Sequence, residues 1–335
     1  MIKKMISIAL LSLSILFILN GCTPHQPVKD IDKFALQKKE IEKRFKHVKV
    51  VRLADINNRP LSEPKGLTFT PDNYLLIVES ENNKIHRHDT EGNYLTEFTI
   101  KFDQEDFLSF PESIAYSPDK TFFISDSSNS RVLKVNRYGK VLKEIKSDDP
   151  TGLFMESKLK DGAGINLNLP SGITISPKGE IFIADTYNNR IVQVSLSGEL
   201  MWTFGDTKNS QGKLFHPRDI AVDLKGLLYV TDDENQVKII KKKKGIIGMF
   251  GGEGSGPGKF KRPKGLTIWH DKYIVVCDPL NQRIQFFTKE GIFIKSISKI
   301  GRVNLKFPYA VKTDVFQNLY IIDKELAILF KVYEF

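Results

Sequence analysis

The sequence predicts an all-β protein: a six-bladed β-propeller of four-stranded antiparallel blades, closed into a ring by an N-terminal strand. The first observation behind this prediction is the segment 169–205, LPSGITISPKGEIFIADTYNNRIVQVSLSGELMWTFG. Short apolar and β-branched runs alternate there with three turn signals, so the segment is typical of four successive strands. A lone four-stranded sheet cannot bury both of its faces, and the segment therefore needs neighbouring copies of itself.

The second observation is that two markers of this segment recur in step along the chain. A proline opens each unit, and an acidic residue ends the second strand of each unit. The prolines are Pro64, Pro111, Pro170, Pro217, Pro263 and Pro308, and the acids are Glu79, Asp126, Asp185, Asp232, Asp278 and Asp323. Both series advance by 47, 59, 47, 46 and 45 residues. A four-stranded unit with this period predicts a propeller of six blades.

The third observation concerns the two ends of the repeat. The sixth unit has only three strand-like runs, 309–313, 319–322 and 328–334, and lacks the outermost one. Residues 48–56, VKVVRLADI, form a strand-like run that belongs to no unit. We expect this run to complete the sixth blade, because that closes the ring and leaves no open sheet edge at the joint.

The N-terminus indicates export and lipid anchoring. A short basic start is followed by the apolar run 5–19, which is too short to span a bilayer, and then by Leu19-Asn20-Gly21-Cys22. These four residues resemble the lipobox of bacterial lipoproteins, in which the cysteine carries the lipid. The resemblance implies a signal peptide over 1–21, a lipid-anchored tether with a short helix over 22–47, and the propeller over 48–335. An ordinary secretory signal with an incidental cysteine is the alternative.

The tether and the residue after Cys22 add two expectations. Thr23 stands where the lipoprotein resemblance links Asp to retention in the inner membrane, so we expect the outer membrane, facing the periplasm, in a Gram-negative cell. Asp30 is expected to cap the helix, whose apolar stripe is Ile31, Phe34, Ile41 and Phe45.

Composition narrows the partners. The formal net charge is +10, which suits attraction to anionic surfaces, while export argues against a nucleic-acid partner. Once Cys22 is acylated, Cys277 has no partner within the chain, and its place in a β-run predicts a buried, unreactive thiol.

Three repeats resemble a known family. FPESIAYSPDKTFFISDSSNSRVLKV (110–135), LPSGITISPKGEIFIADTYNNRIVQV (169–194) and RPKGLTIWHDKYIVVCDPLNQRIQFF (262–287) are similar to NHL repeats. All three have an Asp-x-x-Asn-x-Arg turn, and the second and third have a Pro-x-Gly start. The resemblance implies a six-bladed propeller. It leaves function open, because NHL propellers include RNA binders, protein scaffolds, sensors and a group of metal-dependent lyases.

The repeated acids predict ion pairs across the blade turns. In four blades a basic residue follows the acid five positions later: Glu79 with Lys84, Asp126 with Arg131, Asp185 with Arg190, and Asp278 with Arg283. Asn82, Asn129, Asn188 and Asn281 stand between them, where asparagine tolerates unusual backbone angles and bonds locally. Asp232 is followed at that distance by Val237, so blade 4 is expected to leave Asp232 unpaired and a weak candidate for a cation.

Histidine gives little support for a metal site. His86 and His88 share one face of a strand, where packing between blades is favoured. His216, before Pro217, should lie near the channel mouth and is the better-placed candidate. It is still a weak one, because a catalytic zinc site normally takes three protein ligands. The lyases of the family place histidines from several blades around the channel, but the matching positions here are Glu63, Phe110, Leu169, Arg262 and Phe307. A channel-bound calcium or zinc ion is therefore an alternative for which the sequence identifies no ligand set.

The residues next to the repeated prolines form the candidate binding site. The loop that enters each innermost strand should lie at one mouth of the channel. The predicted ligand-binding residues are Lys65, Glu112, His216, Arg218, Asp219, Arg262, Lys264 and Tyr309. This rim is polar and mainly basic, which suits an anionic ligand such as a carboxylate terminus or a sugar acid.

No catalytic residues are predicted, because the sequence has no nucleophile elbow, phosphate-binding glycine loop or paired-cysteine zinc motif. The favoured function is a lipid-anchored, non-enzymatic envelope module that binds a protein, peptide or glycan at the channel mouth. The alternative is a metal-dependent lyase or hydrolase that uses the central channel, with His216 and Asp219 as contributors. The long loop 147–168 is a candidate lid for the channel.

Overall fold

The computed structural model describes residues 27–146, 165–205 and 212–333, and the side chains from residue 33 onward. The chain divides into two units, residues 1–43 and 44–335. The predicted signal peptide, Cys22 and most of the 147–168 loop lie outside the described residues.

The first unit is represented by one helix, α2 (Pro27–Arg44). It begins three residues before Asp30, so the expected cap at Asp30 is wrong. Proline suits the first turn of a helix, because its fixed φ is helical and the missing N–H has no partner there. Within the described residues, no helix is both long and apolar enough to cross a membrane.

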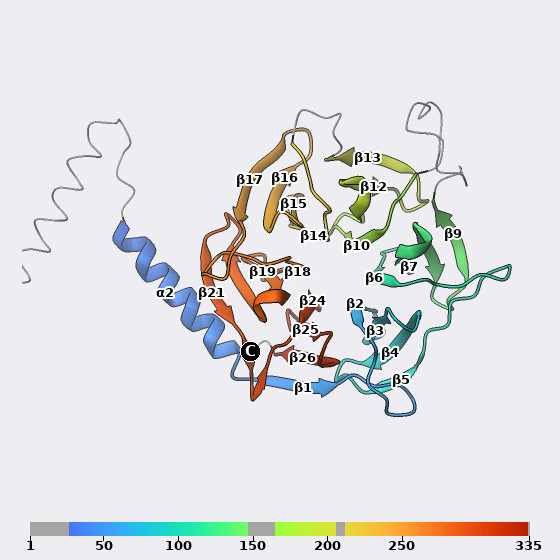
Figure 1. The fold of residues 1–335 in the computed structure, drawn as a ribbon, viewed down its shortest axis with the longest axis horizontal. Coiled ribbons are helices and arrows are strands. Elements are labelled where there is room, and N and C mark those ends of the chain that lie inside the picture. Colours follow the sequence, from blue (N-terminus) through green and yellow to red (C-terminus); the bar gives the residue numbers. More distant parts are fainter. Residues whose placement is uncertain (1–26, 147–164, 206–211, 334–335) are drawn as a thin grey trace, which may run out of the picture. The chain divides into compact units, whose positions relative to one another are not determined.

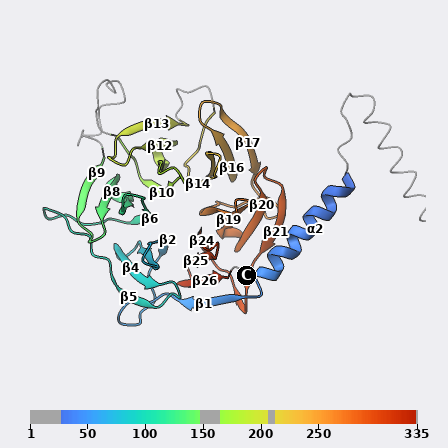
Figure 2. The same ribbon diagram turned by 180° about the vertical axis from the view of Figure 1, so that it is seen from behind.

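The second unit is a ring of six four-stranded antiparallel sheets, and the prediction of a six-bladed propeller is confirmed (Figure 1). Blade 1 is β2 (Pro64–Phe69), β3 (Tyr74–Glu79), β4 (Lys84–Asp89) and β5 (Tyr94–Glu97); blade 2 is β6 (Pro111–Tyr116), β7 (Thr121–Asp126), β8 (Arg131–Asn136) and β9 (Val141–Ile145); blade 3 is β10 (Pro170–Ile175), β11 (Ile181–Asp185), β12 (Arg190–Val194) and β13 (Leu200–Phe204). Figure 2 shows the same ring from behind.

The remaining blades follow the same order from the centre outward. Blade 4 is β14 (Asp219–Val222), β15 (Leu227–Asp232), β16 (Gln236–Lys241) and β17 (Gly245–Gly251); blade 5 is β18 (Leu266–Trp269), β19 (Tyr273–Asp278), β20 (Arg283–Thr288) and β21 (Phe293–Ile297); blade 6 is β24 (Pro308–Thr313), β25 (Leu319–Asp323), β26 (Ile328–Val332) and β1 (Val48–Arg52). A small hairpin, β22 (Lys299–Ile300) and β23 (Val303–Asn304), lies between blades 5 and 6.

The ring is closed by the N-terminal strand, as the sequence predicts. β1 pairs antiparallel with β26 from Val48 opposite Val332 to Arg52 opposite Ile328. The sixth blade is therefore built from both ends of the propeller unit, and no outer edge is left open on β26.

The hydrophobic core lies between neighbouring blades. Phe182 and Ala184 of blade 3, for example, pack with Ile220 and Val230 of blade 4 in one buried cluster. The second strands are covered on both faces, and every residue of β19 is buried, which explains its continuous apolar run. Cys277 lies in this strand as a fully buried free thiol, and burial raises its pKa well above the ordinary value. This fits the predicted unreactive cysteine.

Candidate functional site: the channel mouth

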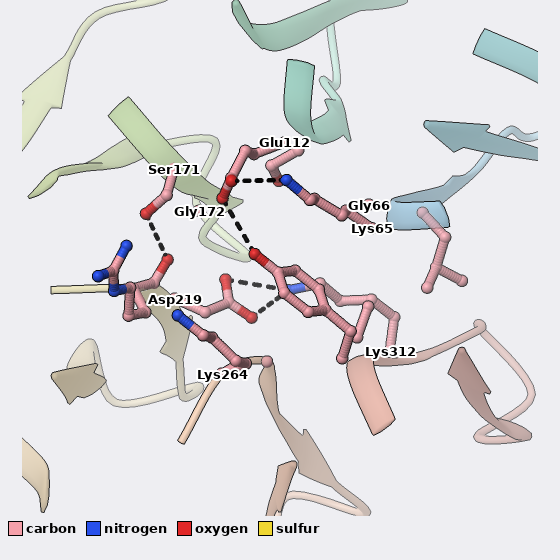
Figure 3. Close-up of a pocket in the computed structure, with 14 residues that line it drawn as sticks. Lys65, Gly66, Glu112, Ser171, Gly172, Asp219, Lys264 and Lys312 are labelled. Atoms are coloured by element: carbon pink, nitrogen blue, oxygen red, sulfur yellow. Dashed lines mark hydrogen bonds and ion pairs between the residues drawn. The ribbon is translucent and has the colours of Figure 1, made fainter. Parts of the chain in front are cut away.

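The residues that follow the six repeated prolines meet around one cavity at the channel mouth. Its lining includes one such residue from each blade: Lys65, Glu112, Ser171, Arg218, Lys264 and Tyr309. Asp219 and Lys312 also line the cavity (Figure 3). The space is about 40 Å³, room for one or two water molecules rather than a ligand of any size.

Close packing of the innermost strands keeps this cavity small. A Cβ atom on Gly66 would lie 2.7 Å from the backbone oxygen of Glu112, and one on Gly265 would lie 2.7 Å from that of Tyr309. The glycine of the Pro-x-Gly start is therefore required where one innermost strand approaches the next.

The residues before the prolines have a shared backbone conformation. Glu63, Phe110, Leu169, His216 and Arg262 all have φ between 43° and 51°, the left-handed region. Three of their N–H groups donate to an asparagine Oδ1 of the preceding blade, from Phe110 to Asn83, from His216 to Asn189 and from Arg262 to Asn235. These hydrogen bonds between blades fix the backbone of His216 and Arg262 at the rim and offset the strain of its left-handed conformation.

Most charges at the mouth are paired with one another. Lys65 lies 3.0 Å from Glu112, and the Tyr309 hydroxyl donates to the same carboxylate at 3.2 Å. Lys312 lies 3.2 Å from Asp219 across the channel. Figure 3 shows these contacts as dashed lines.

Arg218 is held by a carboxylate that sequence reasoning missed. Its Nε donates to Asp233 Oδ1 at 2.9 Å, and its Nη2 donates to Asp233 Oδ2. Burial alone would raise the pKa of Asp233, but the guanidinium outweighs it and holds that pKa below the ordinary range. Asp233 stands directly after the repeated acid of blade 4, and Lys324 has the same place in blade 6. The position after each repeated acid is the signal that would have identified both residues.

Lys264 differs from the other cations of this cavity. Its side chain points into the cavity (Figure 3). Among the described residues, no carboxylate lies within ion-pair distance of its ammonium group. Burial, followed by the nearby Arg218 charge, lowers the pKa of Lys264 to about 8. The mouth therefore contains a desolvated cation without a paired anion.

A wider cavity of about 250 Å³ adjoins the first one and shares Lys65, Lys264 and Tyr309 with it. Its other lining residues are Arg262, Leu280, Phe307 and Lys324. Of the predicted ligand-binding residues, only His216 lines neither cavity. Its ring stacks on Tyr187 at a centroid distance of 4.8 Å, and its Nδ1 lies 3.5 Å from Asp233 Oδ2.

The turn pairs form as predicted in three blades. Asp126–Arg131 and Asp185–Arg190 each join at 2.6 Å, and Asp278–Arg283 joins at 2.8 Å. Asn129, Asn188 and Asn281 bond these acids locally, but the left-handed residue is the next one, Ser130, Asn189 or Gln282.

Two blades contradict the predicted pairs. Glu79 pairs with His86 at 2.7 Å, while Lys84 pairs with Glu97. Asp232 is not unpaired, because Lys238 lies 2.7 Å from it. In both blades the partner stands two residues after the first residue of the third strand, β4 or β16, so it points to the same side as that residue. His88 lies beside His86, and its Nδ1 donates to Gly92 O at 3.0 Å; burial lowers the pKa of His88 to about 4.

The mouth does not fit a divalent metal ion. The carboxylates of Glu112, Asp219 and Asp232, which a metal ion would need as ligands, are already paired with lysine ammonium groups. Across the described ranges, no three His, Cys, Asp or Glu side chains form a group that could hold a metal.

Comparison with known proteins places these observations in a family context. Residues 167–194, which span β10 to β12, match the NHL repeat model. The chain is 27% identical over 168 residues to the probable peptidyl-alpha-hydroxyglycine alpha-amidating lyase pgal-1 of Caenorhabditis elegans. This match covers 44% of the chain and 48% of the lyase, so the chain spans about half the length of that relative.

Solved structures share the fold. Virginiamycin B lyase from Staphylococcus aureus superposes with a TM-score of 0.57 and 15% identity, over 86% of this chain and 99% of the lyase. An auxiliary nutrient binding protein from Bacteroides thetaiotaomicron gives 0.59 and 14%, over 85% and 76%. At these identities the likeness extends to the propeller and no further.

Proposed function

We propose that this six-bladed propeller with an NHL repeat is a lipid-anchored binding module that takes a protein, peptide or glycan ligand at its channel mouth. One observation carries the proposal: all six blades deliver a polar or charged side chain to one mouth, where an adjoining cavity of about 250 Å³ is lined by four basic side chains and two aromatic rings. Concave sites with convergent polar groups and an aromatic wall are typical of ligand binding.

The anchoring part of the proposal rests on the sequence. The run 5–19 and Cys22 support export and acylation, with the outer membrane as the destination in a Gram-negative cell. We expect a Cys22→Ser chain to incorporate no labelled palmitate and to leave the membrane fraction, whereas Cys277→Ser, at the buried thiol, changes neither. Equal labelling of both variants would contradict the anchor.

A lyase is the second candidate, favoured by the 27% identity to the amidating lyase. The family's lyases are metal-dependent, and the mouth residues do not fit a metal ion, as shown above. We therefore derive no catalytic step and keep binding as the preferred function.

The deciding experiment uses the purified full chain in detergent. We expect saturable binding of envelope peptides or glycans in an array, no turnover of peptidyl-α-hydroxyglycine, and less than stoichiometric zinc, calcium and iron by elemental analysis. Turnover together with one bound metal ion per chain would replace the binding module by the lyase.

A further inference from the structure

One sector of the mouth, formed by blades 5, 6 and 1, differs in charge from the rest. Arg262 and Lys264 flank the proline of blade 5, and Phe307 and Tyr309 flank the proline of blade 6. With Lys65, Leu280 and Lys324 they line the cavity of about 250 Å³, which we call the basic cavity. The same two positions on either side of the repeated proline thus supply cations in one blade and aromatic rings in the next.

The carboxylates near the basic cavity neutralise only two of its four cations. Glu63 lies 2.6 Å from Lys324 and 3.5 Å from Lys65, and Glu112 lies 3.0 Å from Lys65. No described carboxylate pairs with Arg262 or Lys264. Among the described residues, these two cations of the cavity therefore lack a carboxylate within ion-pair distance.

The backbone that carries each of these two cations is fixed by bonds within the propeller. The Arg262 backbone is fixed by its left-handed φ of 51° and by its N–H bond of 2.7 Å to Asn235. The Lys264 N–H donates to Cys277 O at 3.0 Å, and its carbonyl accepts from Thr231 at 2.7 Å. A fixed backbone under each side chain lowers the entropy cost of ordering both around a ligand.

The lining of the basic cavity also includes two aromatic rings. The rings of Phe307 and Tyr309 are stacked at 6.4 Å with an angle of 20° between their planes. Lys324 lies 5.0 Å from the Phe307 centroid and 5.5 Å from that of Tyr309, which orders both rings. Leu280, at the rim, is half exposed.

We propose that the basic cavity is an oxyanion subsite: a carboxylate or phosphate of the ligand lies against Lys264 and Arg262, and an adjoining planar or apolar group lies on Phe307, Tyr309 and Leu280. The subsite rests on the proposed binding function and names the ligand chemistry. The two bare cations supply charge-assisted hydrogen bonds, and the aromatic wall selects against small inorganic anions.

Binding at this subsite is coupled to proton uptake. The charged groups that face Lys264 are Arg218, Arg262, Asp233 and Glu112, together with Lys65 across the cavity. The pKa of Lys264 is about 8 in the free protein, and a bound anion favours the ammonium form and raises that pKa. Affinity is therefore highest below pH 8 and falls as the pH rises above 8, with protons taken up on binding in that range.

The test uses the full chain in detergent and three probes: hippurate, which pairs a carboxylate with a ring; phenyl phosphate, its phosphate counterpart; and hippuramide, which is neutral. Calorimetry should show binding of at least one anionic probe with a Kd of about 1 mM or tighter, and none of hippuramide. Lys264→Met and Arg262→Gln should each weaken that binding about tenfold or more. Proton uptake at pH 8.5, measured in buffers of different ionisation enthalpy, should vanish in Lys264→Met.

The matched control is Lys261→Gln, an exposed lysine next to Arg262 that lines neither cavity. It should bind like the wild type, and all variants should keep the wild-type unfolding midpoint. The subsite is refuted if no anionic probe binds, if hippuramide binds equally, or if neither substitution weakens binding. An array ligand that still binds Lys264→Met at full affinity would refute the subsite and leave the binding module standing.

Discussion

Blades 3 and 4 have the same four-stranded fold, but they differ in the turn between the second and third strands. In blade 3, Asp185 is fully buried and accepts from Arg190, Asn188 and the N–H of Asn168. In blade 4, Asp232 is equally buried but the turn is one residue shorter: Asp232 stands opposite Gln236, whereas Asp185 stands opposite Arg190. Lys238 reaches back from inside β16 and takes the place of the arginine.

The difference shows which positions of the repeat are free to vary. The buried acid keeps a cation in both blades, because an uncompensated carboxylate there would be costly. The next residue has no such constraint. Thr186 in blade 3 donates to Pro217 O at 2.8 Å and ties two blades together, whereas Asp233 in blade 4 turns to the mouth and holds Arg218. The buried acid that stabilises the blade and the residue that contributes to the mouth are therefore neighbours in the sequence.

The largest expected effect on stability comes from removing the cation of the turn pair in blade 3. Arg190→Met leaves the Asp185 carboxylate buried without its cation, so the free energy of unfolding should fall by about 3–5 kcal/mol in urea titration. The control Lys178→Met, at an exposed turn of the same blade, should change it by less than about 0.5 kcal/mol. A loss below about 1 kcal/mol for Arg190→Met would show that the turn pair is dispensable.

Blade 4 should respond to the matching change with a dependence on pH. Burial raises the pKa of Asp232 even beside Lys238, so the folded state holds its proton more tightly than the unfolded state. In Lys238→Met this difference grows, and stability should be about 2–4 kcal/mol below wild type at pH 8. The deficit should shrink as the pH falls toward 5, because protonated Asp232 needs no cation. A deficit that is equal at both pH values would contradict this account, and thermal unfolding at each pH measures it.

The smallest expected effect sharpens the role of the mouth residue in blade 4. Asp233 is one of the anions that favour the charged form of Lys264, so Asp233→Asn should bring the pKa of Lys264 below its value of about 8. Acylation of Lys264 at pH 7.5, followed by peptide mass spectrometry, should become about two- to threefold faster. Asp119→Asn, which removes the partner of Lys134 in blade 2, should leave the rate unchanged. An unchanged acylation rate in Asp233→Asn would show that Asp233 does not affect the pKa of Lys264.

Much of the fold was predictable because the strands of a propeller carry strict positional demands. The repeated prolines and acids predicted six blades, and the short sixth unit predicted closure by the run 48–56, of which residues 48–52 form β1. The residues after the prolines could be placed at one mouth because all innermost strands begin there. The interval of five between acid and base failed in blades 1 and 4, since His86 and Lys238 reach the acid from further along the strand. The roles of Asp233 and Lys324 at the mouth could not be predicted, and neither could the lack of a carboxylate partner for Lys264. They depend on contacts between side chains of different blades, which the spacing within one repeat does not show.

The pairing of β1 with β26 has a consequence for biogenesis. The first strand of the propeller to be synthesised is hydrogen-bonded to the last one, from Val48 opposite Val332 to Arg52 opposite Ile328. Individual blades can form as they emerge, because their strands are neighbours in sequence, but the ring cannot close until translation has ended. Strand β1 therefore has no partner until the strands of the sixth blade have been synthesised. During that interval residues 48–52 present unpaired backbone N–H and C=O groups, which makes this strand the point where the chain is most open to pairing with another molecule.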